Sequence, residues 1–163
     1  MKSLEKINNK ILRDWELIPE VLKDWKKSNK IIVFTNGCFD IIHRGHIELL
    51  SKAADLGQKL IIGLNTDTSV QRLKGAGRPL QDETSRAMIL ACFEIVDLVV
   101  LFHQDTPLEL IRLIKPDILV KGGDYKPEEI IGYHEVTSNK GKVVTINFVE
   151  GYSTTSIVKK MKG

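Results

Sequence analysis

The sequence predicts an α/β fold in which five parallel strands form one sheet with helices on both faces. Short apolar, partly β-branched runs alternate along the chain with longer amphipathic stretches, as strands and helices do in such folds. Polar or glycine-rich segments follow several of these runs, as at the carboxyl ends of parallel strands. Because no repeat or interdomain linker interrupts the alternation, we expect the 163 residues to form one globular domain.

The composition disfavours several classes of protein. Hydrophobic residues make up 42% of the chain and charged residues 28%, which is typical of a globular protein. The net charge of +3 suits phosphorylated small molecules, but it is slight and dispersed for a nucleic-acid binder. No segment resembles a membrane span or the apolar core of a signal peptide. Cys38 and Cys92 form no C-x-x-C pair, so we expect a cytoplasmic protein without a zinc or redox motif.

Residues 1–27 are predicted to form a helical extension ahead of the main domain, residues 28–163. Apolar side chains recur at helical spacing over residues 3–27, and Pro19 divides this pattern into two helical pieces. We interpret the extension as a helix packed on the domain or on the partner subunit of a homodimer. A helix on a membrane surface is disfavoured, because acidic side chains are mixed with the lysines.

The rest of the chain is organised around residues 31–57. The run IIVF at 31–34 predicts a buried strand, and a tight polar turn follows it. His43 and His46 come next, three positions apart, so they share one face of a helical first turn. A helix N-terminus attracts anions, and Gly45 lets a phosphate approach the backbone. This stretch therefore predicts a phosphate site between a strand and a helix.

A second strand is predicted at 59–64, and Asn65 and Asp67 follow at its carboxyl end. Both are candidates for contact with a substrate, although Asp67 or Thr68 can also serve as a helix cap. The next segment, 71–80, is a basic loop with two glycines.

Lys74 and Arg78 of this loop can reach over an anionic substrate, although a solvated loop is the alternative interpretation. Arg86 lies in the first turn of the following helix, where a cation opposes the helix dipole. We therefore expect Arg86 to meet an anion.

Two more strands are predicted at 96–102 and 118–120, separated by a helix that ends at Pro116. The second of them runs into a positive side chain, Lys121, and then into a glycine pair and an acidic residue, KGGD. Glycines bring the backbone close to a ligand, so this strand end is expected to line the same crevice. A glycine turn with an exposed lysine is the alternative.

The C-terminal part of the chain carries a fifth strand, predicted at 142–148, after a polar segment at 126–141. Gly151 to Ser156 then opens the last helix with several hydroxyl side chains. Hydroxyls and backbone amides at a helix start can bind phosphate, and a simple N-cap is the alternative interpretation.

Two of these stretches resemble signatures of the cytidylyltransferase-like nucleotidyltransferases. TNGCFDIIHRGH is similar to T-x-G-x-F-D-x-x-H-x-G-H, and GYSTTSIV is similar to the second signature of that superfamily. The resemblance implies a Rossmann-like, doubly wound fold. It also implies that His43, His46 and Lys121 are catalytic. Nucleotide contacts are expected from Thr35, Asn36, Gly37, Cys38, Phe39, Gly45, Gly122, Gly123, Ser153, Thr154 and Thr155. Contacts with the second substrate are expected from Asn65, Asp67, Lys74, Arg78, Arg86 and Asp124.

Within the superfamily the chain most resembles the heptose-1-phosphate adenylyltransferases. FTNGCFDIIHRGHIELL, VKGGDY and GYSTTSIV occur in that order there. The resemblance implies that ATP and D-glycero-D-manno-heptose 1-phosphate form ADP-heptose and pyrophosphate, for lipopolysaccharide core or a related glycan. Some relatives are fused to a sugar kinase, so this chain resembles the stand-alone form. Two features depart from the family pattern: Tyr152 replaces a branched aliphatic residue, and residues 1–27 match less clearly.

Two alternatives remain beside this interpretation. A glycerol-3-phosphate-type cytidylyltransferase shares both signatures, but VKGGDY differs from the acidic segment of that family. A nucleotide-binding regulatory module without catalysis is disfavoured by the intact histidines. The sequence contains no carboxylate cluster of the two-metal kind, so Mg²⁺ is expected to arrive with the ATP.

Overall fold

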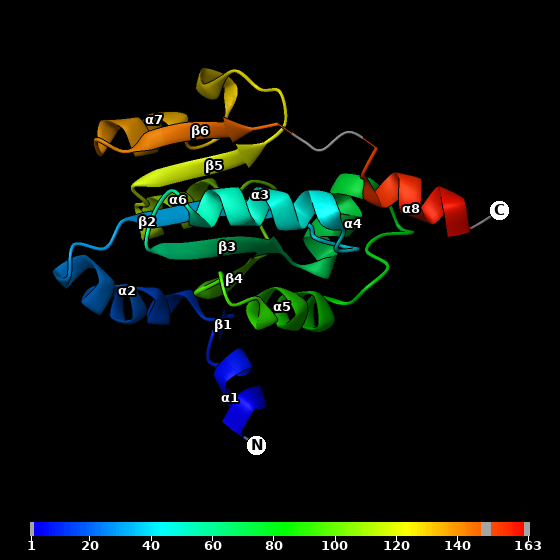
Figure 1. Cartoon of the computed structure of the whole chain (residues 1–163), viewed down its shortest axis with the longest axis horizontal. Helices are drawn as coiled ribbons and strands as arrows, with labels where there is room; N and C mark the ends of the chain where they lie inside the picture. Colours follow the sequence, from blue (N-terminus) through cyan, green and yellow to red (C-terminus); the bar gives the residue numbers. More distant parts are fainter. Residues whose placement is uncertain (1, 148–150, 162–163) are drawn as a thin grey trace.

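The computed structural model describes residues 2–147 and 151–161. Its centre is a six-stranded sheet in the order β1-β4-β3-β2-β5-β6, in which every neighbouring pair is parallel (Figure 1). The strands are β1 (Ile11–Leu12), β2 (Ile32–Gly37), β3 (Lys59–Asn65), β4 (Leu98–Phe102), β5 (Ile118–Gly122) and β6 (Lys142–Ile146). The helices are α1 (Lys2–Asn8), α2 (Ile18–Lys27), α3 (Arg44–Ala54), α4 (Asp67–Lys74), α5 (Glu83–Cys92), α6 (Leu108–Ile114), α7 (Tyr133–Ser138) and α8 (Thr154–Met161). Two short 3₁₀ turns are η1 (Trp15–Leu17) and η2 (Pro127–Glu129).

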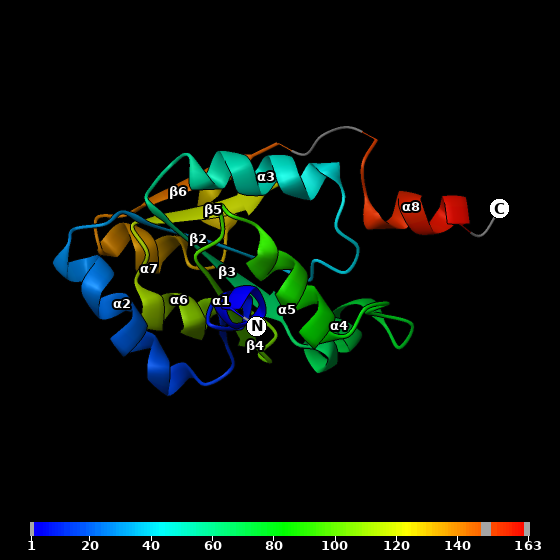
Figure 2. The same cartoon turned by 60° about the horizontal axis from the view of Figure 1, so that its bottom comes forward.

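Helices cover both faces of the sheet, as a doubly wound fold requires. Successive strand residues point to opposite faces, so Val33 packs with α3 and α5 while its neighbours Ile32 and Phe34 pack with α2, α6 and α7. Figure 2 shows α2, α6 and α7 gathered on one side of the sheet and α3 on the other. Burial on both faces explains why the strands read as continuous apolar runs.

The order of the strands reverses between β2 and β5. From β2 the chain adds β3 and then β4 on one side, whereas β5 and β6 are added on the other side. In Figure 1 the arrows of β5 and β6 point toward the side of the molecule where α4 and α8 lie. In open parallel sheets, ligands bind beyond the carboxyl ends of the strands at such a reversal point. We therefore expect a ligand to bind beside the segments that follow β2 and β5.

The structure corrects the sequence interpretation in several places. The sheet has six strands and not five, because Ile11 and Leu12 form an edge strand beside Val99 and Val100 of β4. Residues 1–27 are consequently not a purely helical extension. Pro19 does not divide two helices but lies in the first turn of α2, where its missing N–H costs no hydrogen bond. The last predicted strand ends at Ile146, and its predicted end, Phe148, lies outside the described residues.

Among the residues that the structure describes, no helix is both long and apolar enough to cross a lipid bilayer.

Candidate active site

The turn between β2 and α3 places the two signature histidines at the start of a helix. His43 is the N-cap residue of α3, in an extended conformation, and its side chain makes no capping hydrogen bond. Gly45 is buried in the first turn, and a Cβ atom built on it would lie 3.1 Å from the His43 ring. Glycine thus allows the imidazole to lie against the backbone. The partial positive charge of the helix start is directed to the same place.

His43 and His46 stack on each other, with ring centroids 3.8 Å apart and planes inclined by 22°. Burial is the main cause that lowers the pKa of His46 to about 4, and the neighbouring His43 and Lys74 side chains lower it further. Burial also lowers the pKa of His43. The Nδ1 atoms of both rings are buried without a hydrogen-bond partner among the described residues. Both rings are therefore neutral near pH 7, and the Nδ1 atom of each makes no hydrogen bond within the described part of the protein.

The low pKa of His46 predicts a loss of stability in mild acid. Its unfolded-state pKa is near 6.5, so below that pH the unfolded chain binds a proton that the folded state does not bind until about pH 4. We expect the wild-type free energy of unfolding to fall across this window by about 2–3 kcal/mol more than that of His46→Gln. Urea denaturation of both proteins at pH 7 and pH 4.5 measures the difference. Parallel curves would contradict the assignment.

A cavity of about 200 Å³ opens beside these histidines at the reversal point of the strand order. Its lining residues are Asn36, Gly37, Cys38, Phe39, Asp40, His46, Leu49, Lys74, Lys121, Gly122, Tyr125 and Thr154. They come from the ends of β2, β5 and α4, from the segments that follow β2 and β5, from α3, and from the start of α8. Burial leaves the ammonium group of Lys121 sparsely hydrated, and this lowers the pKa of Lys121. The cavity thus joins two lysines and a helix N-terminus, which is an arrangement suited to a polyanion.

The segment from Arg78 to Arg86 makes hydrogen bonds to the signature turn, which comprises residues 38–43 between β2 and α3. Asp40 is 2% exposed, and its carboxylate accepts from Arg78 Nη1 at 2.8 Å and from the N–H groups of Leu80 and Gln81 at 2.7 and 3.1 Å. Burial opposes the charged form of Asp40, but the Arg78 guanidinium and the two N–H donors outweigh it and hold the pKa of this carboxyl below its usual range. Arg78 thus serves largely to anchor the loop.

Arg86 has a different place from the one expected for a substrate contact. It is 1% exposed, and its guanidinium donates to the carbonyls of Gln81 and Cys38 at 3.0 and 2.6 Å and to Asp67 Oδ1 at 2.7 Å. The anion that Arg86 meets is Asp67. These contacts within the protein replace the direct contact with the second substrate that the sequence predicted for both residues.

The remaining candidates divide into those near the cavity and those away from it. Asn65 is buried, donates to Ser69 Oγ at 2.9 Å and lies beside the Cys38 thiol. Thr35 is buried within β2. Gly123 has a φ of +120°, a conformation that favours glycine.

At the start of α8, Thr154 lines the cavity, whereas Ser153 and Thr155 are exposed. Ser153 Oγ accepts from the N–H of Ser156 at 3.0 Å, which is a capping contact. Asp124 is exposed and does not line this cavity.

Sequence reasoning assigned no role to two residues that matter here. Asp40 belongs to the F-D pair of the first signature, and Tyr125 ends the VKGGDY segment, so both were within quoted motifs. A second cavity of about 230 Å³ shares Asn36, Lys121 and Tyr125 with the first and extends to Pro107, Ile130 and Ile131. The two cavities are therefore neighbours, and Lys121 belongs to the lining of both.

The donors for a metal ion are sparse. Among residues 2–147 and 151–161 no group of three His, Cys, Asp or Glu side chains is arranged to hold a metal ion. Mg²⁺ prefers several oxygen ligands in octahedral geometry. The described side chains do not provide such a set.

Fold and site together define a nucleotide-binding α/β protein with a histidine pair at the phosphate-binding helix. The chain belongs to the cytidylyltransferase-like family, whose profile matches residues 34–160. This match includes the signature turn, both lysines of the cavity and most of α8.

Curated relatives resemble the chain over nearly all of its length. It is 53% identical over 151 residues to the bifunctional protein HldE of a Nitratiruptor species, covering 93% of this chain and 32% of that protein. The bifunctional protein HldE of Nitrobacter hamburgensis is 49% identical, with 94% and 32% covered. The chain thus spans about a third of the length of these relatives.

Two solved structures share the fold. A lipopolysaccharide core biosynthesis protein from Thermoplasma volcanium has a TM-score of 0.61 at 28% identity, covering 76% of this chain and 99% of that one. A pantoate-beta-alanine ligase from Francisella tularensis has a TM-score of 0.65 at 16% identity, covering 93% and 76%. The second likeness concerns the fold alone.

Proposed function

We propose that the protein is an adenylyltransferase that joins ATP and D-glycero-D-manno-heptose 1-phosphate to give ADP-heptose and pyrophosphate, for lipopolysaccharide core or a related glycan. The observation that carries the transfer reaction is the stacked histidine pair at the start of α3, beside a cavity that also holds Lys74 and Lys121. Membership of the cytidylyltransferase-like family supports the same class of reaction. Adenine and heptose rest on the resemblance described above and on the relatives near 50% identity.

The reaction needs positioning and charge stabilisation more than covalent chemistry. An oxygen of the sugar phosphate attacks the α-phosphorus, the bond to the β-phosphate oxygen breaks, and pyrophosphate leaves with the electron pair. Neutral His46 donates one hydrogen bond through a ring N–H, and Lys121 supplies positive charge. Lys74, at the end of α4, lines the same cavity and adds a second positive charge. Mg²⁺ would arrive on the triphosphate oxygens and supply further positive charge there.

The second substrate has room in the adjoining cavity of about 230 Å³. Its walls combine Asn36, Tyr125 and Glu129 with apolar side chains, which suits a sugar with polar hydroxyls and apolar C–H faces. Lys121 borders both cavities and can meet the sugar phosphate as well as the triphosphate. We further propose a cytoplasmic homodimer, in keeping with the free thiols of Cys38 and Cys92 and the exposed Leu17.

A pyrophosphate-release assay tests this function. The protein receives Mg²⁺ with ATP or CTP and with either D-glycero-D-manno-heptose 1-phosphate or glycerol 3-phosphate. We expect the ATP–heptose pair to turn over at least about tenfold faster than any other, because a mismatched base leaves buried polar groups unpaired. Faster turnover with CTP and glycerol 3-phosphate would assign the protein to the cytidylyltransferases of polyol phosphates. No turnover with any pair would favour a regulatory nucleotide-binding module.

A further inference from the structure

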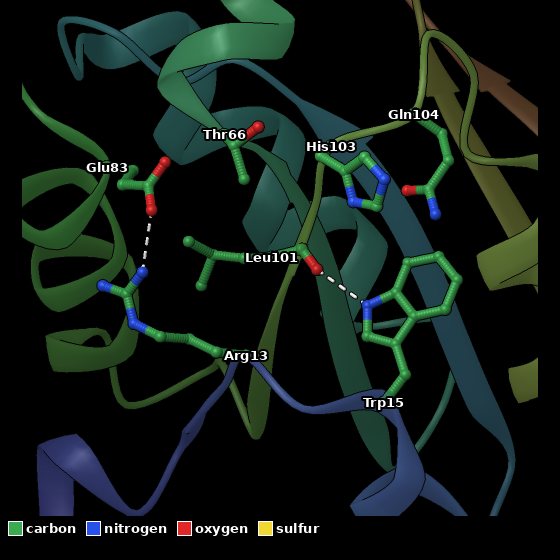
Figure 3. A pocket seen from close by; sticks show the side chains of 7 residues that line it. All are labelled: Arg13, Trp15, Thr66, Glu83, Leu101, His103 and Gln104. Carbon is green, nitrogen blue, oxygen red and sulfur yellow. Dashed lines mark hydrogen bonds and ion pairs between the residues drawn. The ribbon is translucent and has the colours of Figure 1, made fainter.

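A series of polar contacts begins at the N-terminal segment. Arg13, just after β1, donates from Nη1 to Glu83 and from Nη2 to Thr84 Oγ1, both at 2.8 Å. Figure 3 shows the Arg13–Glu83 pair on one wall of a cavity of about 300 Å³, with Trp15 on the opposite wall. The Trp15 indole N–H donates to the Leu101 carbonyl at 2.8 Å. The chain after β1 is thus fastened on both sides of this cavity.

The contacts continue inward from Glu83. Its second oxygen accepts from the backbone N–H of Asp67 at 2.9 Å, and the carboxylate of Asp67 accepts from Arg86 at 2.7 Å. Arg86 then donates to the Cys38 carbonyl at 2.6 Å. The exposed side-chain fraction falls from 50% at Arg13 to zero at Arg86. The innermost contacts are therefore shielded from water, which strengthens them relative to the outer ion pair.

The end of this series lies next to a strained residue. Phe39 follows Cys38 and has a φ of +44°, which is unfavourable for a residue with a Cβ atom. Such a conformation persists only where its surroundings hold it. The Phe39 ring packs against His46 with centroids 5.1 Å apart. A hydrogen bond to the Cys38 carbonyl therefore acts one residue away from the side chain that supports His46.

We propose that Arg13, Glu83, Asp67 and Arg86 form a positioning network that ties the N-terminal segment to the signature turn and keeps His46 in place. Arg86 and Asp67 are then positioning residues, and β1 contributes to the scaffold of the site. The kinetic part of this inference rests on the proposed function, but its structural part does not. The network assigns a role to the part of the chain that matches the family pattern least.

Kinetics of single variants test the network from its inner to its outer end. Arg86→Lys and Asp67→Asn should lower kcat by about 10- to 100-fold with little change in the KM for ATP, because a small misplacement of a catalytic group costs that much. Arg13→Gln should lower kcat by about two- to fivefold, as for an exposed ion pair. The matched control is Arg112→Gln, which removes a 51% exposed arginine that pairs with Glu109 and Glu135 on α6 and α7. It should leave kcat unchanged.

An NMR titration of His46 tests the same network without any substrate. In the wild type its pKa should be about 4, and in Arg86→Lys and Asp67→Asn it should rise toward 6.5 as the ring becomes better hydrated. If Arg86→Lys fails to fold, Asp67→Asn decides the question. An unchanged His46 pKa in the folded variants would overturn the positioning network. A wild type that is inactive with every substrate pair, but whose variants show the shifted pKa, would overturn the proposed function alone.

Discussion

Replacing His46 with alanine is expected to lower kcat by on the order of 10²–10³, the loss seen when one donor to a developing charge is removed. His46 lines the cavity, stacks on His43, and has a neutral ring whose Nδ1 atom has no partner among the described residues. A neutral ring that lines the cavity can donate its N–H to a ligand bound there. The KM for ATP should change much less than kcat, because the loss concerns the transition state.

The measurement is steady-state pyrophosphate release, with circular dichroism to check that His46→Ala is folded. His134→Ala is the matched control, because His134 is an exposed histidine on α7. It should retain the wild-type kcat. Turnover of His46→Ala within about threefold of the wild type, well below the expected loss, would remove His46 from the mechanism.

Asp40→Asn is expected to destabilise the fold by about 2–4 kcal/mol, because it breaks a buried charge pair. The carboxylate is almost fully buried and accepts three hydrogen bonds, from Arg78 and from two backbone N–H groups. Removing one partner of a buried pair leaves the other charge without compensation, and here the partial exposure of Arg78 reduces the cost. The amide of asparagine also turns a donor toward groups that donate. Activity should fall as well, because Asp40 holds the turn next to Phe39.

Urea denaturation at pH 7 measures this effect on stability. Asp105→Asn is the matched control, because Asp105 pairs with Arg72 at 2.8 Å but is 72% exposed. An exposed pair of this kind contributes less than about 1 kcal/mol. Equal losses for the two variants would show that the three hydrogen bonds accepted by Asp40 do not stabilise the fold significantly.

The signature region could be predicted from sequence because its information is local. An apolar strand, a short polar turn and a helix start follow one another directly in the chain, and a helical first turn brings residues three apart together. His43 and His46 accordingly stack, and Lys121 lies in the same cavity because the strand that carries it neighbours β2. Parallel strands whose carboxyl ends meet at one edge made that placement foreseeable.

The fold class and the order of the main strands along the chain were determined by the sequence itself, because the period of apolar residues reports which faces are buried. The edge strand β1 was not foreseeable, since two residues are too few to show a strand period. The roles of Arg86, Arg78 and Arg13 were decided only by the tertiary structure. Their acidic partners lie 19, 38 and 70 residues away in sequence, and local spacing carries no information about contacts at such separations. In the sequence, such an arginine suggests contact with an anionic substrate. Only the folded structure shows the carboxylate of the protein that neutralises the buried guanidinium group.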